Sequence, residues 1–185
     1  MIYRNYIVFI ILVFLYTLPR YISFLPTLPV YDNTEATTVL KKRQNITSKD
    51  IDFFKLTDET ITNAFIDHVN ESYNELEKMI TSINVLMPIL FLKYLINRPR
   101  PYQIISNINP LHSNTGDTPS MPAGHAFQAY YLAHILSQRY PEKSGLFNNI
   151  AKHCDEVRVN GGIHYPSDGV LSKYVVDTLI EMGVY

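Results

Sequence analysis

The stretch RVNGGIHYPSDG, residues 158–169, holds the side chains best suited to chemistry. Five residues separate Arg158 from His164, and three separate His164 from Asp168. If Pro166 is the first residue of a helix, Asp168 is its third, from which the carboxylate reaches back to His164. A carboxylate bonded to one ring nitrogen fixes the tautomer and leaves the other nitrogen free and more basic, as a nucleophilic or metal-binding imidazole requires. The alternative is a capped turn whose Arg158 and His164 are merely solvated.

A second cluster lies in KYLINRPRP, residues 93–101. Lys93 is a charge within an otherwise apolar run, so it is either a snorkelling side chain or a cation aimed at an anion. Arg100 is the second cation of this cluster, and Arg98 competes with it for the same role.

The third cluster is PAGH, residues 122–125, at the start of a further apolar periodic segment. The first N–H groups of a helix have no partner within the helix and favour phosphate, so the amide of Gly124 is a candidate donor. His125 is either the acid of this cluster or a partly exposed residue near the helix start.

Apolar periodicity predicts that helices position these residues. A long amphipathic helix is expected from Thr57 to Ile80, because Ile61, Phe65 and Val69 recur near helical spacing. Residues 19–56 are expected to be an extended lead-in with one short helix, and 101–121 a loop. The other helices are expected at 82–96, where Pro88 starts or kinks the helix, at 124–140, at 144–157 and from Pro166 onward. Strand signals are scarce, so the predicted fold class is all-α, a compact helical bundle.

Composition limits the function classes. The chain has 185 residues, a formal charge of -1 and a single cysteine, Cys154. This charge balance argues against a nucleic-acid partner, and the Cys and His spacings suggest no metal site. Oligomeric state cannot be deduced.

The N-terminal stretch differs from the rest. Its apolar run, Tyr6–Leu18, has 13 residues, which matches a signal-peptide core and is short for a membrane span. We expect residues 1–30 to be a signal peptide or an anchor that tethers the protein through residues 6–18, although a buried helix is the third alternative. Residues 31–185 are then one domain, secreted or anchored with an extracytoplasmic body. The run Ile83–Ile96 is too short to span, so this body is predicted to be soluble.

Taken in order, K-x6-R-P, P-x-G-H and R-x5-H-x3-D resemble the three-part signature of the type 2 phosphatidic acid phosphatase superfamily. That superfamily includes class A non-specific acid phosphatases and vanadium haloperoxidases. The resemblance covers residues 55–182 and is closest in architecture to the soluble acid phosphatases. The sequence GGIHYPSD also resembles the corresponding segment of haloperoxidase-like members.

The resemblance implies a metal-independent phosphatase with no cofactor. Lys93, Arg100 and Arg158 would hold the phosphate oxygens with the Gly124 amide, and His164, oriented by Asp168, would form a phosphohistidine. His125 would protonate the leaving oxygen. The implied substrate is a phosphorylated small molecule, a lipid head group or a diphosphate, and vanadate would inhibit.

Two positions depart from the family pattern. Ala123 and Val157 stand where the family usually has serine, and the loss at Ala123 removes one hydroxyl hydrogen bond to phosphate, which is worth about 1–3 kcal/mol. Two alternatives follow. One is a vanadate-dependent haloperoxidase, with vanadate as the cofactor. The other is a catalytically degenerate secreted protein that binds phosphate without turnover.

Overall fold

In the computed structural model, residues 34–185 are described, and every regular element among them is a helix. The expected all-α fold class is confirmed. The predicted leader, residues 1–30, lies outside the described residues. Residues 34–185 form eight α-helices, namely α2 (Glu35–Gln44), α3 (Ser48–Glu59), α4 (Tyr73–Ile80), α5 (Ile83–Ile96), α6 (Pro101–Ile104), α7 (Gly124–Arg139), α8 (Ser144–Asn160) and α9 (Pro166–Glu181). Three short 3₁₀ helices complete them, namely η1 (Ile61–Ala64), η2 (Ile66–His68) and η3 (Pro141–Lys143).

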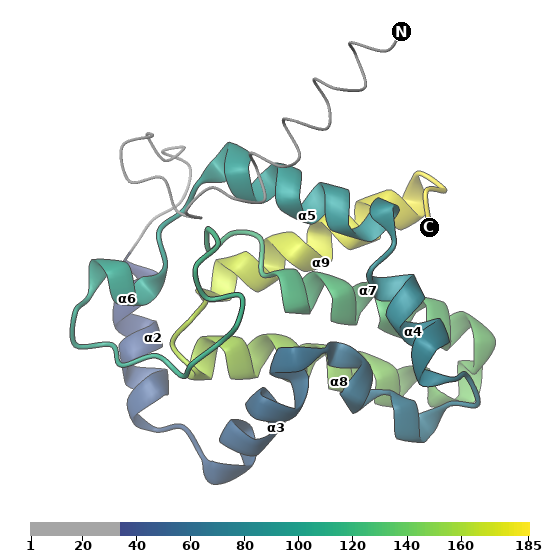
Figure 1. Ribbon diagram of the computed structural model, residues 1–185, viewed down its shortest axis with the longest axis horizontal. Helices are drawn as coiled ribbons and strands as arrows, with labels where there is room; N and C mark the ends of the chain where they lie inside the picture. Colours follow the sequence, from purple (N-terminus) through teal and green to yellow (C-terminus); the bar gives the residue numbers. More distant parts are fainter. Residues whose placement is uncertain (1–33) are drawn as a thin grey trace, which may run out of the picture.

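The centre of the molecule is the packing of α7 against α8, with α9 and α5 on one side and α3 and α4 on the other (Figure 1). Small side chains at Ala129, Ala133 and Ala151 are fully buried here, so the two backbones can approach closely. Larger apolar side chains from η1, α4 and α8 close the core around them. This packing fixes the ends of α7 and α8 relative to each other.

Three of these helices place the predicted chemistry at one end of the bundle. In Figure 1, α7 and α9 begin at the same end at which α8 finishes, and the loop between α6 and α7 passes across that end. Gly124 therefore opens α7 close to Arg158 in the last turn of α8. Asp168 is the third residue of α9 after Pro166. The expected helices at 82–96, 124–140, 144–157 and after Pro166 are confirmed within a few residues.

The predicted long helix from Thr57 to Ile80 is wrong. Helix α3 stops at Glu59 because Thr60 is extended and its side chain accepts a hydrogen bond from the Thr62 amide, which starts η1. A second break follows, where Ser72 and Glu75 form a capping box that starts α4 afresh. The apolar residues of 61–80 face the core from separate short pieces.

The predicted extended lead-in is also wrong over residues 35–56, where the chain forms α2 and most of α3. Tertiary packing explains α2, because Ala36 and Val39 are buried against Ile108, Val159 and Tyr165. Such contacts outweigh the weak intrinsic helix propensity of the TEATT sequence. The loop predicted for 101–121 contains α6, and Pro88 lies within α5 and does not start it.

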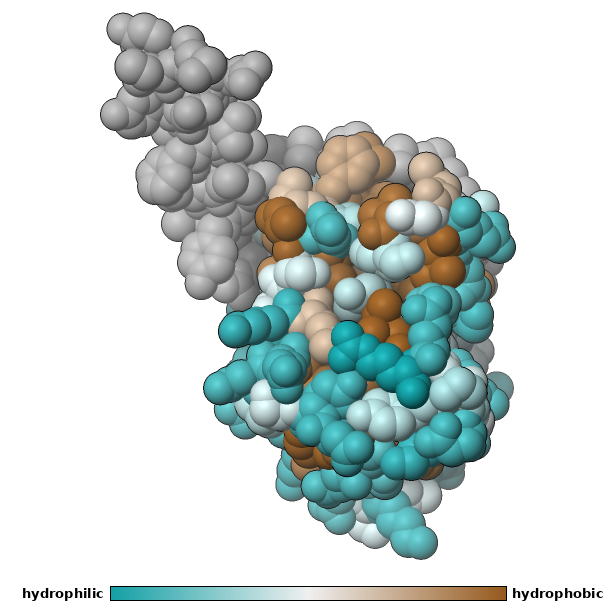
Figure 2. All heavy atoms as spheres, turned by 90° about the vertical axis from the view of Figure 1, so that its right-hand side faces the viewer, coloured by the Kyte–Doolittle hydropathy of each residue, from teal (hydrophilic) through white to brown (hydrophobic). Residues whose placement is uncertain are grey.

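Helix α5 presents an apolar outer face. Its exposed large apolar side chains recur at helical spacing and are Ile83, Met87, Leu90, Phe91 and Leu95. Figure 2 shows apolar side chains gathered in the upper half of the face turned to the viewer, with hydrophilic ones below. Among residues 34–185 no single helix meets the length and hydropathy of a membrane span. Tyr73–Ile80 and Ile83–Ile104, bent by 42°, meet them only as a pair.

Candidate active site

The carboxylate of Asp168 is hydrogen-bonded through both of its oxygens. It is fully buried, and its Oδ2 accepts from Nδ1 of His164 at 3.0 Å, from the Tyr165 amide at 2.9 Å and from the hydroxyl of Ser120. Burial raises the pKa of Asp168, but the bonds from His164, the charge of Arg98 and the bond from Ser120 outweigh it, so the net shift is downward. The carboxylate therefore stays ionised and fixes the His164 ring.

The other ring nitrogen of His164 faces Arg100. Nη1 of Arg100 lies 3.0 Å from Nε2 of His164 and donates to the Ile163 carbonyl at 2.8 Å. Because a guanidinium only donates, Nε2 is the acceptor and the proton resides on Nδ1, toward Asp168. Burial, with the charge of Arg100 next, lowers the pKa of His164 to about 3. The ring is neutral, with a lone pair on Nε2.

Arg158 is fully buried against the end of α3. Its Nη1 donates to Oδ1 of Asp58 at 2.9 Å, its Nη2 donates to the Thr57 hydroxyl at 2.6 Å, and its guanidinium lies over the ring of Phe54. Among the described residues, Nε of Arg158 has no hydrogen-bond partner. A buried donor without an acceptor is costly, and a phosphate oxygen would satisfy it.

Lys93 lies on the inner face of α5. The side chain is buried. Cε of Lys93 lies 3.8 Å from the position that a Cβ on Gly124 would occupy, so Lys93 rests against the first turn of α7. Its Nζ donates to the carbonyl of Pro119. Burial, followed by the charge of Arg100, lowers the pKa of Lys93 well below its usual value. This ammonium group is thus held beside a second cation, as an anion-binding role requires.

His125, in the first turn of α7, faces α3. Its Nε2 donates to the carbonyl of Asp58 at 3.1 Å. Burial, followed by the charge of Arg158, lowers the pKa of His125 to about 3, while the bond and charge of Asp58 oppose the shift. A bound phosphate would reverse part of this shift, because it would offset the charge of Arg158.

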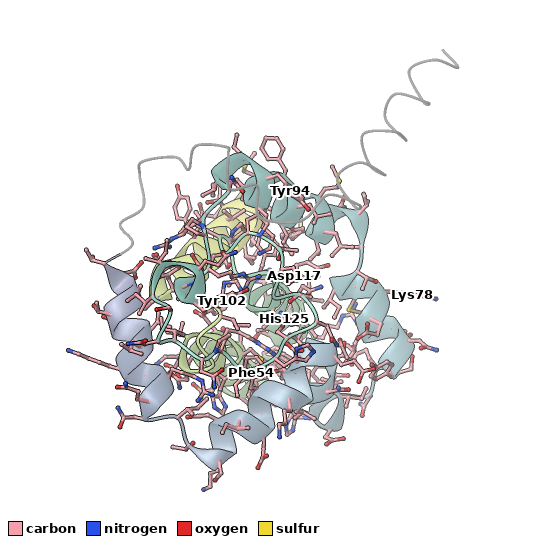
Figure 3. All side chains as sticks on the ribbon, turned by 60° about the vertical axis from the view of Figure 1, so that its left-hand side comes forward. Phe54, Lys78, Tyr94, Tyr102, Asp117 and His125 are labelled. Carbon is pink, nitrogen blue, oxygen red and sulfur yellow. The ribbon has the colours of Figure 1, made fainter. Side chains whose placement is uncertain are left out.

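Every residue predicted for the site is therefore at one end of the bundle. The histidines, lysine and two arginines act on one another electrostatically. Figure 3 shows His125 and Phe54 on this side of the molecule, while Lys78 projects outward from α4. Buried cations that lower one another's pKa mark a candidate functional site. The described residues contain no group of three or more His, Cys, Asp or Glu side chains placed to hold a metal ion.

The loop between α6 and α7 covers this end. It supplies main-chain carbonyls to Arg100, from Thr115 at 3.0 Å and Thr118 at 2.8 Å. Two pockets flank the loop. One, of about 300 Å³, is lined in part by Phe54 and Asp58, and the other, of about 460 Å³, is lined in part by Tyr102 and Ile163. The pockets border the buried cluster, and Lys93, Arg100 and Arg158 are not among the residues that line them.

The fold and site define a helical protein with a buried cluster of cations around a carboxylate-braced histidine. The profile of the PAP2 superfamily matches residues 78–175, more than half of the chain. The chain therefore belongs to the PAP2 superfamily, and the resemblance drawn from its motifs is confirmed. This membership supports a phosphatase activity in general.

Among solved structures, the chain is similar to a transmembrane PAP2-type phosphatidylglycerolphosphate phosphatase from Bacillus subtilis. The two share 18% identity with a TM-score of 0.39, over 83% of this chain and 80% of the other. No curated protein sequence matches the chain.

Sequence reasoning missed the residues that support Asp168 and Arg158. The K-x6-R-P motif selected Arg100 over the competing Arg98, and the two guanidinium groups lie on opposite sides of the His164–Asp168 pair. Asn97, in the left-handed conformation at φ 48°, ends α5 just before them. Nη1 of Arg98 donates to Oδ1 of Asp168 at 2.8 Å, and its Nη2 donates to Glu35 at 3.1 Å.

Replacing Arg98 by methionine is expected to destabilise the fold by about 3–5 kcal/mol, because it leaves the buried Asp168 without its ionic partner. Urea unfolding measures this loss. The matched control is Arg139→Met, whose partner Glu71 forms a surface pair with Arg139 45% exposed and is expected to contribute at most about 1 kcal/mol. Equal losses in the two variants would show that Arg98 does not support the site.

Proposed function

We propose that the protein is a metal-independent phosphatase that hydrolyses phosphomonoesters, including lipid or diphosphate head groups, through a phosphohistidine on His164. The observation that carries the proposal is a neutral His164, braced by Asp168 at Nδ1 and contacted by Arg100 at Nε2, in one electrostatic cluster with the buried Lys93 and Arg158. Charge on the three equatorial phosphate oxygens in the transition state is what such cations stabilise. Their presence supplies the neutralisation that a metal ion provides in other phosphatases.

The roles proposed for these residues are those that the resemblance to the family implies. Lys93, Arg100 and Arg158 hold the phosphate oxygens, and the Gly124 amide at the start of α7 adds a donor. Nε2 of His164 attacks phosphorus as the ester P–O bond breaks, and Asp168 stabilises the ring as it becomes charged. His125 gives its proton to the leaving oxygen.

A second step releases phosphate. A water molecule attacks the phosphorus of the phosphohistidine, the P–N bond breaks, and His125 accepts the proton that water loses. His164 returns to its neutral state with Nδ1 bonded to Asp168, and orthophosphate leaves past the α6–α7 loop. Vanadate, which adopts the five-coordinate geometry of the transition state, is expected to inhibit.

Hydrolysis of p-nitrophenyl phosphate in the presence of a metal chelator tests the proposal. We expect turnover that the chelator does not reduce and that vanadate inhibits, because the protein's own cations neutralise the phosphate. Loss of activity with chelator would contradict metal independence. Binding of orthophosphate without turnover would identify a degenerate member, and oxidation of halide only after vanadate addition would identify a haloperoxidase.

A panel of nucleotides, sugar phosphates and lipid diphosphates then ranks the head groups by kcat/KM. Ala123 is fully buried at the residue before α7, and it supplies no hydroxyl to the phosphate. Because Ala123 adds no side-chain donor, we expect the ranking to follow the charge of the head group and the fit of its leaving group beside the α6–α7 loop.

A further inference from the structure

The last turn of α3 contacts both the predicted acid and one of the phosphate-binding cations through a single residue. The carboxylate of Asp58 accepts from Arg158 at 2.9 Å, and its main-chain carbonyl accepts from His125 at 3.1 Å. The same carboxylate accepts from the Ser113 hydroxyl at 2.6 Å and from the main-chain N–H of Asn114 at 3.2 Å. Asp58 lies outside residues 78–175, which the family profile matches.

Asp58 lies at the C-terminal end of its helix, where the backbone favours a neighbouring positive charge. Helix α3 ends at Glu59, so the Asp58 carbonyl is one of the last four, which lack a partner within the helix. The C-terminus of a helix carries partial negative charge and favours a cation beside it. Both the carbonyl and the carboxylate of Asp58 therefore stabilise positive charge on His125 and Arg158.

We propose that Asp58 is a positioning residue for the phosphatase reaction, which holds His125 as the acid, fixes Arg158 and anchors the α6–α7 loop across the site. The inference rests on the proposed function, because it assigns His125 and Arg158 the roles given above. Asp58 itself touches no reacting atom. It acts through the ring and the guanidinium that it orients.

The charged and titratable groups that face His125 come from three directions. Arg158 approaches from α8, Asp58 from α3 and His164 from the segment before α9. Arg158 and His164 disfavour the protonated ring, and Asp58 favours it. Without the Asp58 charge, His125 loses its proton at lower pH, so the basic limb of the pH–rate profile is expected to move to lower pH.

The test compares Asp58→Asn with Asp52→Asn, which removes the same charge from an exposed position of α3. We expect Asp58→Asn to lower kcat about 10- to 100-fold, the range for a misplaced or less protonated general acid. The inhibition constant of orthophosphate is expected to stay equal or fall, because Thr57 and the ring of Phe54 still hold Arg158, whose charge is then less neutralised. A site that was merely disordered would bind phosphate more weakly as it lost turnover.

Asp58→Glu restores the charge and is expected to recover part of kcat and the position of the basic limb. Thermal melts of all three variants separate loss of fold from loss of positioning. A kcat and pH profile for Asp58→Asn equal to those of Asp52→Asn would overturn the inference. So would a joint loss of phosphate binding and turnover.

Titration of the His125 ring by NMR, with and without orthophosphate, decides the inference independently of turnover. A lower midpoint in Asp58→Asn than in Asp52→Asn is expected, and equal midpoints would overturn it. If the unmodified protein hydrolyses no phosphate ester, the proposed function fails, yet this titration still reports whether Asp58 governs the charge of His125. The two failures are therefore distinguishable.

Discussion

Replacing His164 by alanine is expected to abolish hydrolysis of p-nitrophenyl phosphate, with kcat lowered by about 10⁵-fold or more, as when a catalytic nucleophile is removed from other enzymes. The reason is that the His164 ring lies between Asp168, which is bonded to Nδ1, and the guanidinium of Arg100, which contacts the unprotonated Nε2. Steady-state kinetics at substrate saturation measures the loss. Binding of orthophosphate should persist, since Lys93, Arg100 and Arg158 remain.

The control for this variant is His134→Ala. His134 lies in the second half of α7, where its Nε2 is hydrogen-bonded to Gln138 at 2.9 Å, away from the cations. Its removal is expected to leave kcat unchanged. If His164→Ala turned over substrate at the parent rate, His164 would not be the nucleophile, whatever its geometry.

Trapping of the covalent intermediate supplies a second readout for His164. A phosphorus–nitrogen bond is labile in acid and stable in base. Radioactive phosphate from labelled substrate is therefore expected to stay on the protein after a basic quench and to be lost in acid. His125→Ala is expected to accumulate this label, because the p-nitrophenolate leaves without protonation while the second step lacks its base. Label that survives in His164→Ala would place the bond on another residue.

The helices that carry the site were predictable because their sequence signals are local. Pro166 fixes the start of α9 and so places Asp168 at its third position. An apolar run that is followed by Pro99 and Pro101 predicts α5. The spacing of His164 and Asp168 then follows from helix geometry alone. The order of the three motifs along the chain was sufficient for recognition of the family.

The remainder of the site depends on contacts that sequence spacing does not encode. Asp58 is 100 residues from Arg158 along the chain, and it reaches the site because α3 packs across α8. Glu35 contacts Arg98 from α2, a helix stabilised mainly by tertiary packing. The ion pair of Arg98 with Asp168 likewise joins residues 70 apart along the chain, a contact that sequence spacing does not reveal.

Replacing Arg100 by alanine is expected to lower kcat/KM about 10²- to 10³-fold, the range for loss of one preorganised donor to a developing charge. Arg100 binds a phosphate oxygen in the proposed mechanism, and its Nη1 also donates to Nε2 of His164. The substrate must therefore draw Nη1 away from Nε2 before the ring attacks. Steady-state kinetics measures the loss of turnover, and the inhibition constant of orthophosphate measures the loss of phosphate binding.

The pH dependence identifies which part of the loss belongs to His164. The charge of Arg100 contributes, after burial, to lowering the pKa of His164 to about 3, and the ring must be neutral to attack. Without Arg100 that pKa rises, so the acid limb of the pH–rate profile is expected to move to higher pH. Arg100→Lys keeps the charge but loses the paired donors, and it should hold the acid limb near the parent position while kcat/KM still falls. An acid limb that stays at the parent pH in Arg100→Ala would show that this guanidinium does not control the protonation of the nucleophile.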